Sequence, residues 1–332
     1  MVRFNVFYAK LYKNRPLRLS TLKEKCYFCS PMKHELSILI PVYNTVCTGI
    51  VERLSMQCQR IAADDGSFRY EIIVADDASP RKDCIEANKS IGAMPNCRYI
   101  VKAENTGSAA TRNFLAREAR FGWLLFLDCD MEIVHPGFIR RYLDTEAVGV
   151  INGGISIGNG CSQNLRFLYE KESEPFHTAE QRRRRPYQSF RSTNFIIERK
   201  SMLACPFDER FTRSGYEDVM LGKELRRHNI PITHIDNPTL MTDFETNPDY
   251  IAKIERSLHT LFRFRKELQG YSRLLTLVDG IHVGVVKTAI RLWHRLFGTL
   301  ERRNLCGRRP SLTVFKLYRL GYYLNLEVRG ER

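Results

Sequence analysis

An apolar run that stops at two carboxylates constrains this chain more than any other feature. Residues Trp123 to Leu127 are bulky and apolar, and Asp128 and Asp130 follow directly. The run is too short for a helix, so it predicts a buried strand. Carboxylates are costly in an apolar interior, and ligands of open α/β sheets bind where strands leave the sheet. Side chains one residue apart share a face, so both carboxylates can face one hard cation; the alternative is a surface turn.

Three earlier strands with polar endings are predicted at Leu36–Val42, Tyr70–Ala75 and Cys97–Val101. Helical patterns separate these strands, and this alternation implies βαβ units and a mostly parallel sheet. The polar strand ends should therefore meet at one edge and form a single pocket. No Gly-x-Gly-x-x-Gly follows the first strand, which argues against the usual dinucleotide site. We predict an α/β fold with a Rossmann-like, mostly parallel sheet flanked by helices.

The charge of the chain points to an anionic partner. The formal net charge is +15 over 332 residues, with a pI of about 9.4. Such an excess favours a phosphate-bearing substrate, a nucleic acid or an acidic membrane surface. The ten cysteines contain only one close pair, Cys26 and Cys29, and no secretory signal is recognisable. We therefore expect free thiols in a reducing cytoplasm and, without a long apolar run, no spanning helix.

The second half of the chain is predicted to continue with shorter strands and with helices. Residues 178–191 hold the run Arg182–Arg185 and are interpreted as a mobile polar loop. An amphipathic helix is expected over residues 248–268. Beyond Leu274, apolar residues alternate with arginine and lysine. Core packing is expected up to Ile290, whereas residues 291–326 leave two interpretations open: core packing, or a basic helix lying on an anionic bilayer.

Five motifs occur in an order that resembles the family 2 glycosyltransferases with the GT-A fold. They are Ile40–Asn44, Val74–Ser79, Asn105–Asn113, Phe126–Asp130, and Phe207–Phe211 leading into Gly215–Asp218. Each motif is weak alone, but five in this order are specific. The part from Asn194 onward is similar to the acceptor region of galactosyltransferases and chondroitin-type synthases.

The resemblance implies a division of the chain into three parts. A basic N-terminal arm would cover residues 1–34, and a GT-A domain would cover residues 35–268. That domain would have a nucleotide-sugar half at 35–136 and an acceptor half at 137–268. Residues 269–332 would form a C-terminal extension of basic amphipathic helices.

The resemblance also implies inverting transfer from a UDP-sugar to a hydroxyl acceptor, with Mn²⁺ or Mg²⁺. Pro41, Val42 and Tyr43 would flank the base, and Asp77 would hydrogen-bond the uracil ring. The remaining positions that match the family's nucleotide-binding segment are Arg112, Asn113 and Asp128. Of these, Asp128 would approach the ribose or the sugar.

On the acceptor side, Asp218 matches the family's general base and Glu217 its contact with the acceptor sugar. Such a base must deprotonate the incoming hydroxyl. Asp130 would hold the metal on the diphosphate. Many relatives complete the metal site with a histidine where this chain has Met241, and a thioether is a soft ligand that suits Mg²⁺ poorly. Three alternatives are left open: Met241 binds Mn²⁺, Asp243 takes the place of the histidine, or the metal is held loosely.

The expected partners are a nucleotide sugar, a glycan, polysaccharide or lipid-linked acceptor, and the anionic inner face of the cell membrane, with no nucleic acid. The expected location is cytoplasmic and peripheral at that membrane. Two other functions stay open. One is a haloacid-dehalogenase-like phosphatase with Asp128 as its nucleophile. The other is a non-catalytic basic protein that binds nucleic acid, whose affinity would depend steeply on salt.

Overall fold

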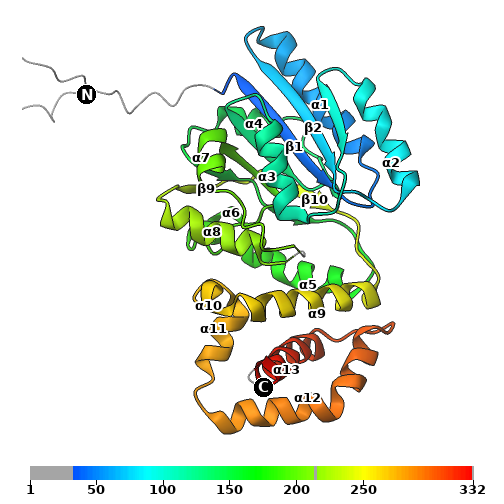
Figure 1. Cartoon of the computed structure of the whole chain (residues 1–332), viewed down its shortest axis with the longest axis vertical. Coiled ribbons are helices and arrows are strands. Elements are labelled where there is room, and N and C mark those ends of the chain that lie inside the picture. Colours follow the sequence, from blue (N-terminus) through cyan, green and yellow to red (C-terminus); the bar gives the residue numbers. More distant parts are fainter. Residues whose placement is uncertain (1–32, 213–214, 331–332) are drawn as a thin grey trace, which may run out of the picture. The chain divides into compact units, whose positions relative to one another are not determined.

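A seven-stranded sheet lies at the centre of the protein (Figure 1). The computed structural model describes residues 33–212 and 215–330, with side chains up to Leu326, and the described residues belong to one compact unit. The strand order is β3-β2-β1-β4-β8-β6-β9. These strands are β1 (Glu35–Val42), β2 (Arg69–Asp76), β3 (Cys97–Val101), β4 (Trp123–Leu127), β6 (Val150–Asn152), β8 (Asn194–Glu198) and β9 (Ile232–His234).

The prediction of a mostly parallel sheet is confirmed. Strand β1 pairs in parallel with β2 and β4, and β2 pairs in parallel with β3. Among the described strands of this sheet, β8 alone runs against its neighbours β4 and β6. A second sheet has the order β5-β10-β7. Its strands are β5 (Met131–Glu132), β7 (Ile155–Ile157) and β10 (Thr239–Met241).

Helices cover both faces of the central sheet (Figure 1). Apolar residues of α1 and α4 pack on one face, and those of α3, α7 and α8 on the other. In chain order the helices are α1 (Thr48–Asp64), α2 (Lys82–Asn88), η1 (Lys89–Ala93), α3 (Ser108–Glu118), α4 (Phe138–Asp144), α5 (Leu165–Ser173), η2 (Glu174–Phe176), α6 (Ala179–Arg183), α7 (Arg199–Ala204), α8 (Glu217–Arg227), α9 (Asn247–Arg263), α10 (Arg265–Leu268), α11 (Arg273–Gly280), α12 (Gly284–Leu305) and α13 (Leu312–Gly330).

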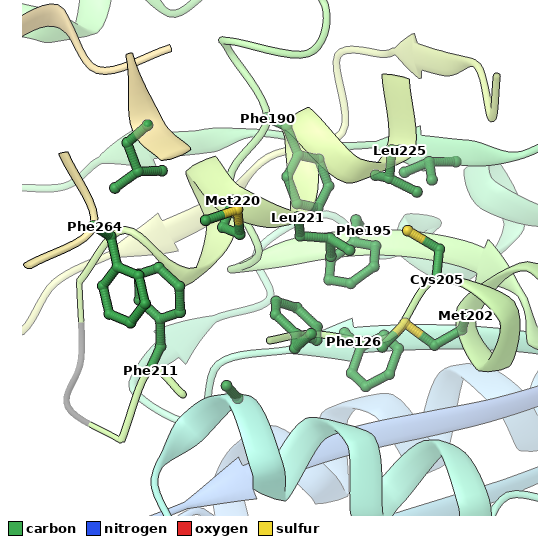
Figure 2. Close-up of a cluster of buried hydrophobic side chains, with 14 of the residues drawn as sticks. Phe126, Phe190, Phe195, Met202, Cys205, Phe211, Met220, Leu221, Leu225 and Phe264 are labelled. Atoms are coloured by element: carbon green, nitrogen blue, oxygen red, sulfur yellow. The ribbon is translucent and has the colours of Figure 1, made fainter. Parts of the chain in front are cut away.

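The apolar run of β4 divides between the two faces because side chains alternate along a strand. Phe126 joins the cluster shown in Figure 2, where its ring stacks on Phe195 with centroids 4.9 Å apart. Leu125 and Leu127 belong to the cluster on the opposite face, together with Phe138 of α4. All five residues of β4 are buried. This double-sided packing fixes the point at which the chain leaves the sheet at Asp128.

The C-terminal helices divide into packed and exposed elements. Tyr323 and Leu324 of α13 belong to the same core cluster as Leu258 of α9, so α13 packs against the rest of the protein. Helix α12 instead exposes a row of large apolar side chains. Within residues 33–212 and 215–330, no helix has the length and apolar character needed to cross a bilayer. The predicted boundaries at residues 136 and 268 stay predictions, and the predicted arm at 1–34 lies almost wholly outside the described residues.

The interpretation of residues 178–191 as a mobile polar loop is wrong for Arg182, whereas Arg183, Arg184 and Arg185 are exposed. The segment contains α6, and Arg182 is 4% exposed. The Arg182 guanidinium donates to the carbonyl oxygens of Asn152, Gly153 and Ile235. Gly154 leaves room for it, because a Cβ there would lie 2.5 Å from Arg182 Nη2. Carbonyl groups from distant strands therefore satisfy this charge, and the local sequence contained no sign of them.

Candidate active site

A cavity of about 890 Å³ opens at the carboxyl ends of β1 and β4. All predicted site residues line it except Asn113 and the two candidate ligands Met241 and Asp243. The predicted residues in its wall are Pro41, Val42, Tyr43, Asp77, Arg112, Asp128, Asp130, Glu217 and Asp218. Asp130 and Asp218 are thus brought into one cavity although 88 positions separate them in the chain. Parallel strands end at one edge of a sheet, which explains why the polar residues after β1, β2 and β4 gather there.

Asp77 organises the loop that leads into α3. Its carboxylate accepts hydrogen bonds from Lys102 Nζ at 2.6 Å, from the Thr106 amide at 3.0 Å and from the Gly107 amide at 2.8 Å. Burial acts to raise the pKa of Asp77, but Lys102 and these donors outweigh it and lower the pKa, so the group stays ionised. Gly107 adopts φ 89°, and a Cβ there would lie 2.6 Å from the Thr212 carbonyl oxygen. The position therefore requires glycine.

Arg112 connects the two sides of the cavity. This residue of α3 is 4% exposed, and its Nη2 donates to Asp128 Oδ1 at 2.7 Å. Its Nη1 lies 3.9 Å from Glu217 Oε1, and its guanidinium lies over the Phe207 ring at 5.4 Å. Burial acts to lower the pKa of Arg112, but Asp128 and Glu217 outweigh it and raise the pKa. One buried cation therefore neutralises a carboxylate from each half of the chain.

The start of α8 presents two adjacent carboxylates to the cavity. Glu217 accepts from Ser108 Oγ at 2.9 Å and from the Gly215 amide at 2.6 Å, which hold it in place. Asp218 accepts from the Val219 amide at 2.8 Å. Burial, followed by the like charge of Glu217, raises the pKa of Asp218 from 3.8 to about 6. A carboxylate with this pKa is suited to accept a proton near neutral pH.

The turn before α8 is strained. Tyr216 adopts φ 70°, a left-handed conformation that is unfavourable for a bulky residue. Such strain persists only where the surrounding structure maintains it, and it concentrates at functional sites. The two residues that follow Tyr216, Glu217 and Asp218, line the cavity.

Asp128 and Asp130 form the acidic side of the cavity next to β4. Desolvation, together with the like charge of Asp128, raises the pKa of Asp130, while Arg166 and Lys253 act to lower it. Both Arg166 and Lys253 are ion-paired with Glu245. The carboxylate oxygens of Asp128 and Asp130 are ligands that suit Mg²⁺ or Mn²⁺. Two carboxylates are too few to enclose a metal, and the described residues contain no group of three His, Cys, Asp or Glu side chains that could do so.

The structure does not bring Met241 or Asn113 to the cavity. Met241 packs in a small apolar cluster with Met131 and Ile157. Asn113 is buried, and its amide donates to the Phe207 carbonyl and accepts from the Phe207 amide, both at 2.9 Å. It therefore fastens α3 to the segment before α8. Asp243, the other candidate ligand, does not line the cavity.

Several cavity residues were missed by sequence reasoning. Lys253 and Arg256 of α9 form part of the wall, as do Ser192, Thr193 and Thr212. The two basic residues lie three positions apart, which is neighbour spacing on a helix. That spacing was the available signal, but charged residues on the polar side of an amphipathic helix are ordinarily solvated.

The sequence of this chain is similar to that of known glycosyltransferases. Residues 37–206 match glycosyl transferase family 2. The chain is 27% identical to chondroitin synthase of Escherichia coli over 227 residues, which is 58% of this chain and 32% of that protein. It is 33% identical to an uncharacterized glycosyltransferase of Haemophilus influenzae over 97 residues, which is 29% of each chain. The chain thus spans 32% and 29% of the lengths of these curated relatives.

The fold is similar to that of a mannosyltransferase from Pyrobaculum calidifontis, solved in complex with GDP-Man and Mn²⁺. The TM-score is 0.55 at 14% identity, over 89% of this chain and 86% of that one. The fold and the sequence matches define the class of protein: it is a glycosyltransferase with a GT-A-like fold. The chain belongs to glycosyl transferase family 2. Membership in this family argues against the two alternative functions, namely a phosphatase with Asp128 as its nucleophile and a non-catalytic protein that binds nucleic acid.

Proposed function

We propose that the enzyme transfers a sugar from a UDP-sugar to a hydroxyl group of a glycan, polysaccharide or lipid-linked glycan, with inversion at the anomeric carbon. The observation that carries this proposal is the shared cavity of Asp130 and Asp218. Inverting displacement needs a base on the side of the incoming hydroxyl. It also needs stabilisation of the leaving diphosphate on the other side. The two carboxylates provide a group for each task.

On the donor side, the wall formed by Pro41, Val42 and Tyr43 would receive the base. Tyr43 is 48% exposed and lines the cavity, so its ring is available for contact with a planar group. Asp77 Oδ2 accepts from the Gly107 amide. Since a carboxylate oxygen has room for about two donors, one position on Oδ2 is free in this proposal for the N–H of uracil.

A divalent cation fits the donor set on chemical grounds. Mg²⁺ is usually held by one or two carboxylates together with substrate phosphates and water, and Asp128 and Asp130 are two such carboxylates in the cavity wall. The mannosyltransferase of similar fold was solved with Mn²⁺. We propose that Asp130 holds the metal and that Asp128, tied to Arg112, faces the ribose or the sugar. When bound, the metal would neutralise charge that develops on the diphosphate.

The metal role predicts a loss of metal-dependent nucleotide binding in Asp130→Asn. Because the amide carries no charge for the cation, we expect the affinity for UDP in the presence of Mn²⁺ to fall about tenfold or more. Isothermal titration with UDP, with and without Mn²⁺, measures this. Glu132→Gln is the matched control, since Glu132 is exposed and bonds Thr242 outside the cavity. Equal UDP affinities with and without Mn²⁺ in the wild type would remove the metal from the proposal.

We also propose that α12 binds the anionic surface of a membrane. Its apolar side chains recur every three or four residues on one face, and three of them, Val285, Leu296 and Leu300, are 77%, 67% and 60% exposed. The helix has five basic residues and one acidic residue. That acid, Glu301, is buried and accepts from Trp293 Nε1 at 2.9 Å. An exposed apolar face beside basic side chains is typical of helices that lie on anionic bilayers.

Charge favours a bilayer over a second copy of the chain at this face. Two α12 helices packed face to face would bring their basic side chains together, and juxtaposed like charges are costly. The cytoplasmic location at the inner face of the membrane stays a prediction.

The membrane role predicts weaker vesicle binding in Leu296→Glu. In this proposal the bilayer buries Leu296, so replacing it with a negatively charged side chain should lower binding to vesicles that contain an anionic phospholipid by about tenfold to a hundredfold. Flotation with anionic and with neutral vesicles measures this. Val148→Glu is the matched control, because Val148 is 60% exposed, close to the 67% of Leu296, but lies outside α12. Equal flotation of the two variants would contradict the role of α12.

A further inference from the structure

A groove extends from the active-site cavity along α9. Its volume is about 220 Å³, and it shares Thr212 and Arg256 with the wall of the cavity. The other polar residues in its wall are Arg210, His259, Thr260 and Arg263. A Cβ on Gly215, in the turn before Asp218, would lie 2.8 Å from Ser257 Cβ on α9. The part of α9 next to Arg256 therefore adjoins the start of α8, and the groove starts on the side where the acceptor hydroxyl would meet its base.

Three basic residues of α9 lie on one face of the helix, in a row that also contains Thr260. Lys253, Arg256, Thr260 and Arg263 follow at spacings of three and four residues, which places them side by side. The helix rises 1.5 Å per residue, so this row extends about 15 Å away from Lys253. It therefore continues from the cavity wall into the groove.

The groove is positively charged, with little internal compensation. None of the described residues that line it is acidic. Within the described residues, no carboxylate lies within 4 Å of the Arg256 or Arg263 guanidinium, whereas Lys253 pairs with Glu245 and Arg210 with Asp208. Exposed arginines are often simply solvated. Here they form one row that leads into a catalytic cavity.

One aromatic ring, that of Phe264, contacts two of the arginines. The guanidinium carbons of Arg210 and Arg263 lie 5.2 Å and 5.3 Å from the centroid of the Phe264 ring. That ring is buried and stacks on Phe211 at 4.1 Å. Contacts of this kind restrain a guanidinium, and a pre-organised cation loses less entropy when it binds an anion.

We propose that this groove binds an oxyanion carried by the acceptor, either the carboxylate of an acidic sugar or a phosphate, next to the hydroxyl that receives the sugar. The inference rests on the proposed function of the cavity and adds the chemical class of the acceptor. Arg256 is the contact nearest the reacting hydroxyl. Arg263 and Arg210 bind farther along the groove, where guanidinium groups match carboxylate and phosphate geometry.

The test is a ligand-observed NMR titration of the full chain in the presence of saturating UDP and Mn²⁺. The probes are p-nitrophenyl glucuronide, its neutral methyl ester and glucose 1-phosphate. We expect at least one anionic probe to bind about tenfold more tightly than the ester at low salt, and to lose this advantage as ionic strength rises. A preference for the glucuronide assigns a carboxylate, and a preference for the sugar phosphate assigns a phosphate.

Arg263→Gln should reduce the affinity for the preferred anionic probe about tenfold. Lys266→Gln removes the same charge and should leave this affinity unchanged. Lys266 is exposed on the neighbouring α10 and lines neither the groove nor the cavity. Equal binding of charged and neutral probes, or equal effects of the two substitutions, would overturn the inference. UDP binding by the wild-type chain is measured first. Its absence would instead count against the proposed donor site.

Discussion

Replacing Asp218 with asparagine is expected to slow sugar transfer by about 10²-fold to 10⁴-fold while leaving the affinity for UDP within about twofold of wild type. The amide keeps the shape of the side chain but cannot take the proton of the acceptor hydroxyl. Single-turnover transfer and UDP titration separate the two effects. Asp83→Asn makes the same chemical change at an exposed carboxylate on α2 and should alter neither quantity. Loss of UDP binding in Asp218→Asn would mean that Asp218 supports the donor site and is not the base.

The pH profile gives a second readout for the same residue. Because the pKa of Asp218 is raised to about 6, the carboxylate is protonated and inactive as a base below that pH. The kcat/KM of the wild type should therefore fall about tenfold for each pH unit below 6 and level off above it. In Asp218→Asn this step should disappear. If kcat/KM fell at the same pH in both proteins, the fall would be due to the titration of another group.

Replacing Arg112 with methionine is expected to lower the free energy of unfolding by about 3–5 kcal/mol. The substitution keeps a long, helix-compatible side chain but leaves Asp128 and Glu217 without their shared cation. Removing one partner from a buried charge cluster is costly because the remaining charges lose their compensation. Thermal unfolding should shift downward by on the order of 10 °C.

Arg117→Met on the same helix is the matched control for Arg112. Arg117 is 58% exposed, and its Nη1 lies 3.7 Å from Glu209. Exposed pairs of this kind contribute about 0–1 kcal/mol, so we expect little change in unfolding. If the two substitutions destabilised the protein equally, Arg112 would not be the group that joins the two halves of the cavity.

The sequence alone determined the order of the main elements and the positions of the acidic residues at their ends. The strands predicted at Trp123–Leu127 and Cys97–Val101 have the same bounds in the structure. These patterns are readable because a buried strand must be continuously apolar and must end where its carboxylates reach solvent. Parallel βαβ topology then predicted that the strand ends share one pocket.

The tertiary structure alone decided which neighbouring residues point into that pocket. Arg112 and Asn113 are adjacent in one motif, yet Arg112 lines the cavity and Asn113 bonds Phe207. Successive side chains on a helix point about 100° apart, so the motif cannot tell which of them faces a ligand. Arg182 was misread for a related reason. A polar run is solvated unless distant carbonyl groups surround it, and such partners exist only after the chain has folded.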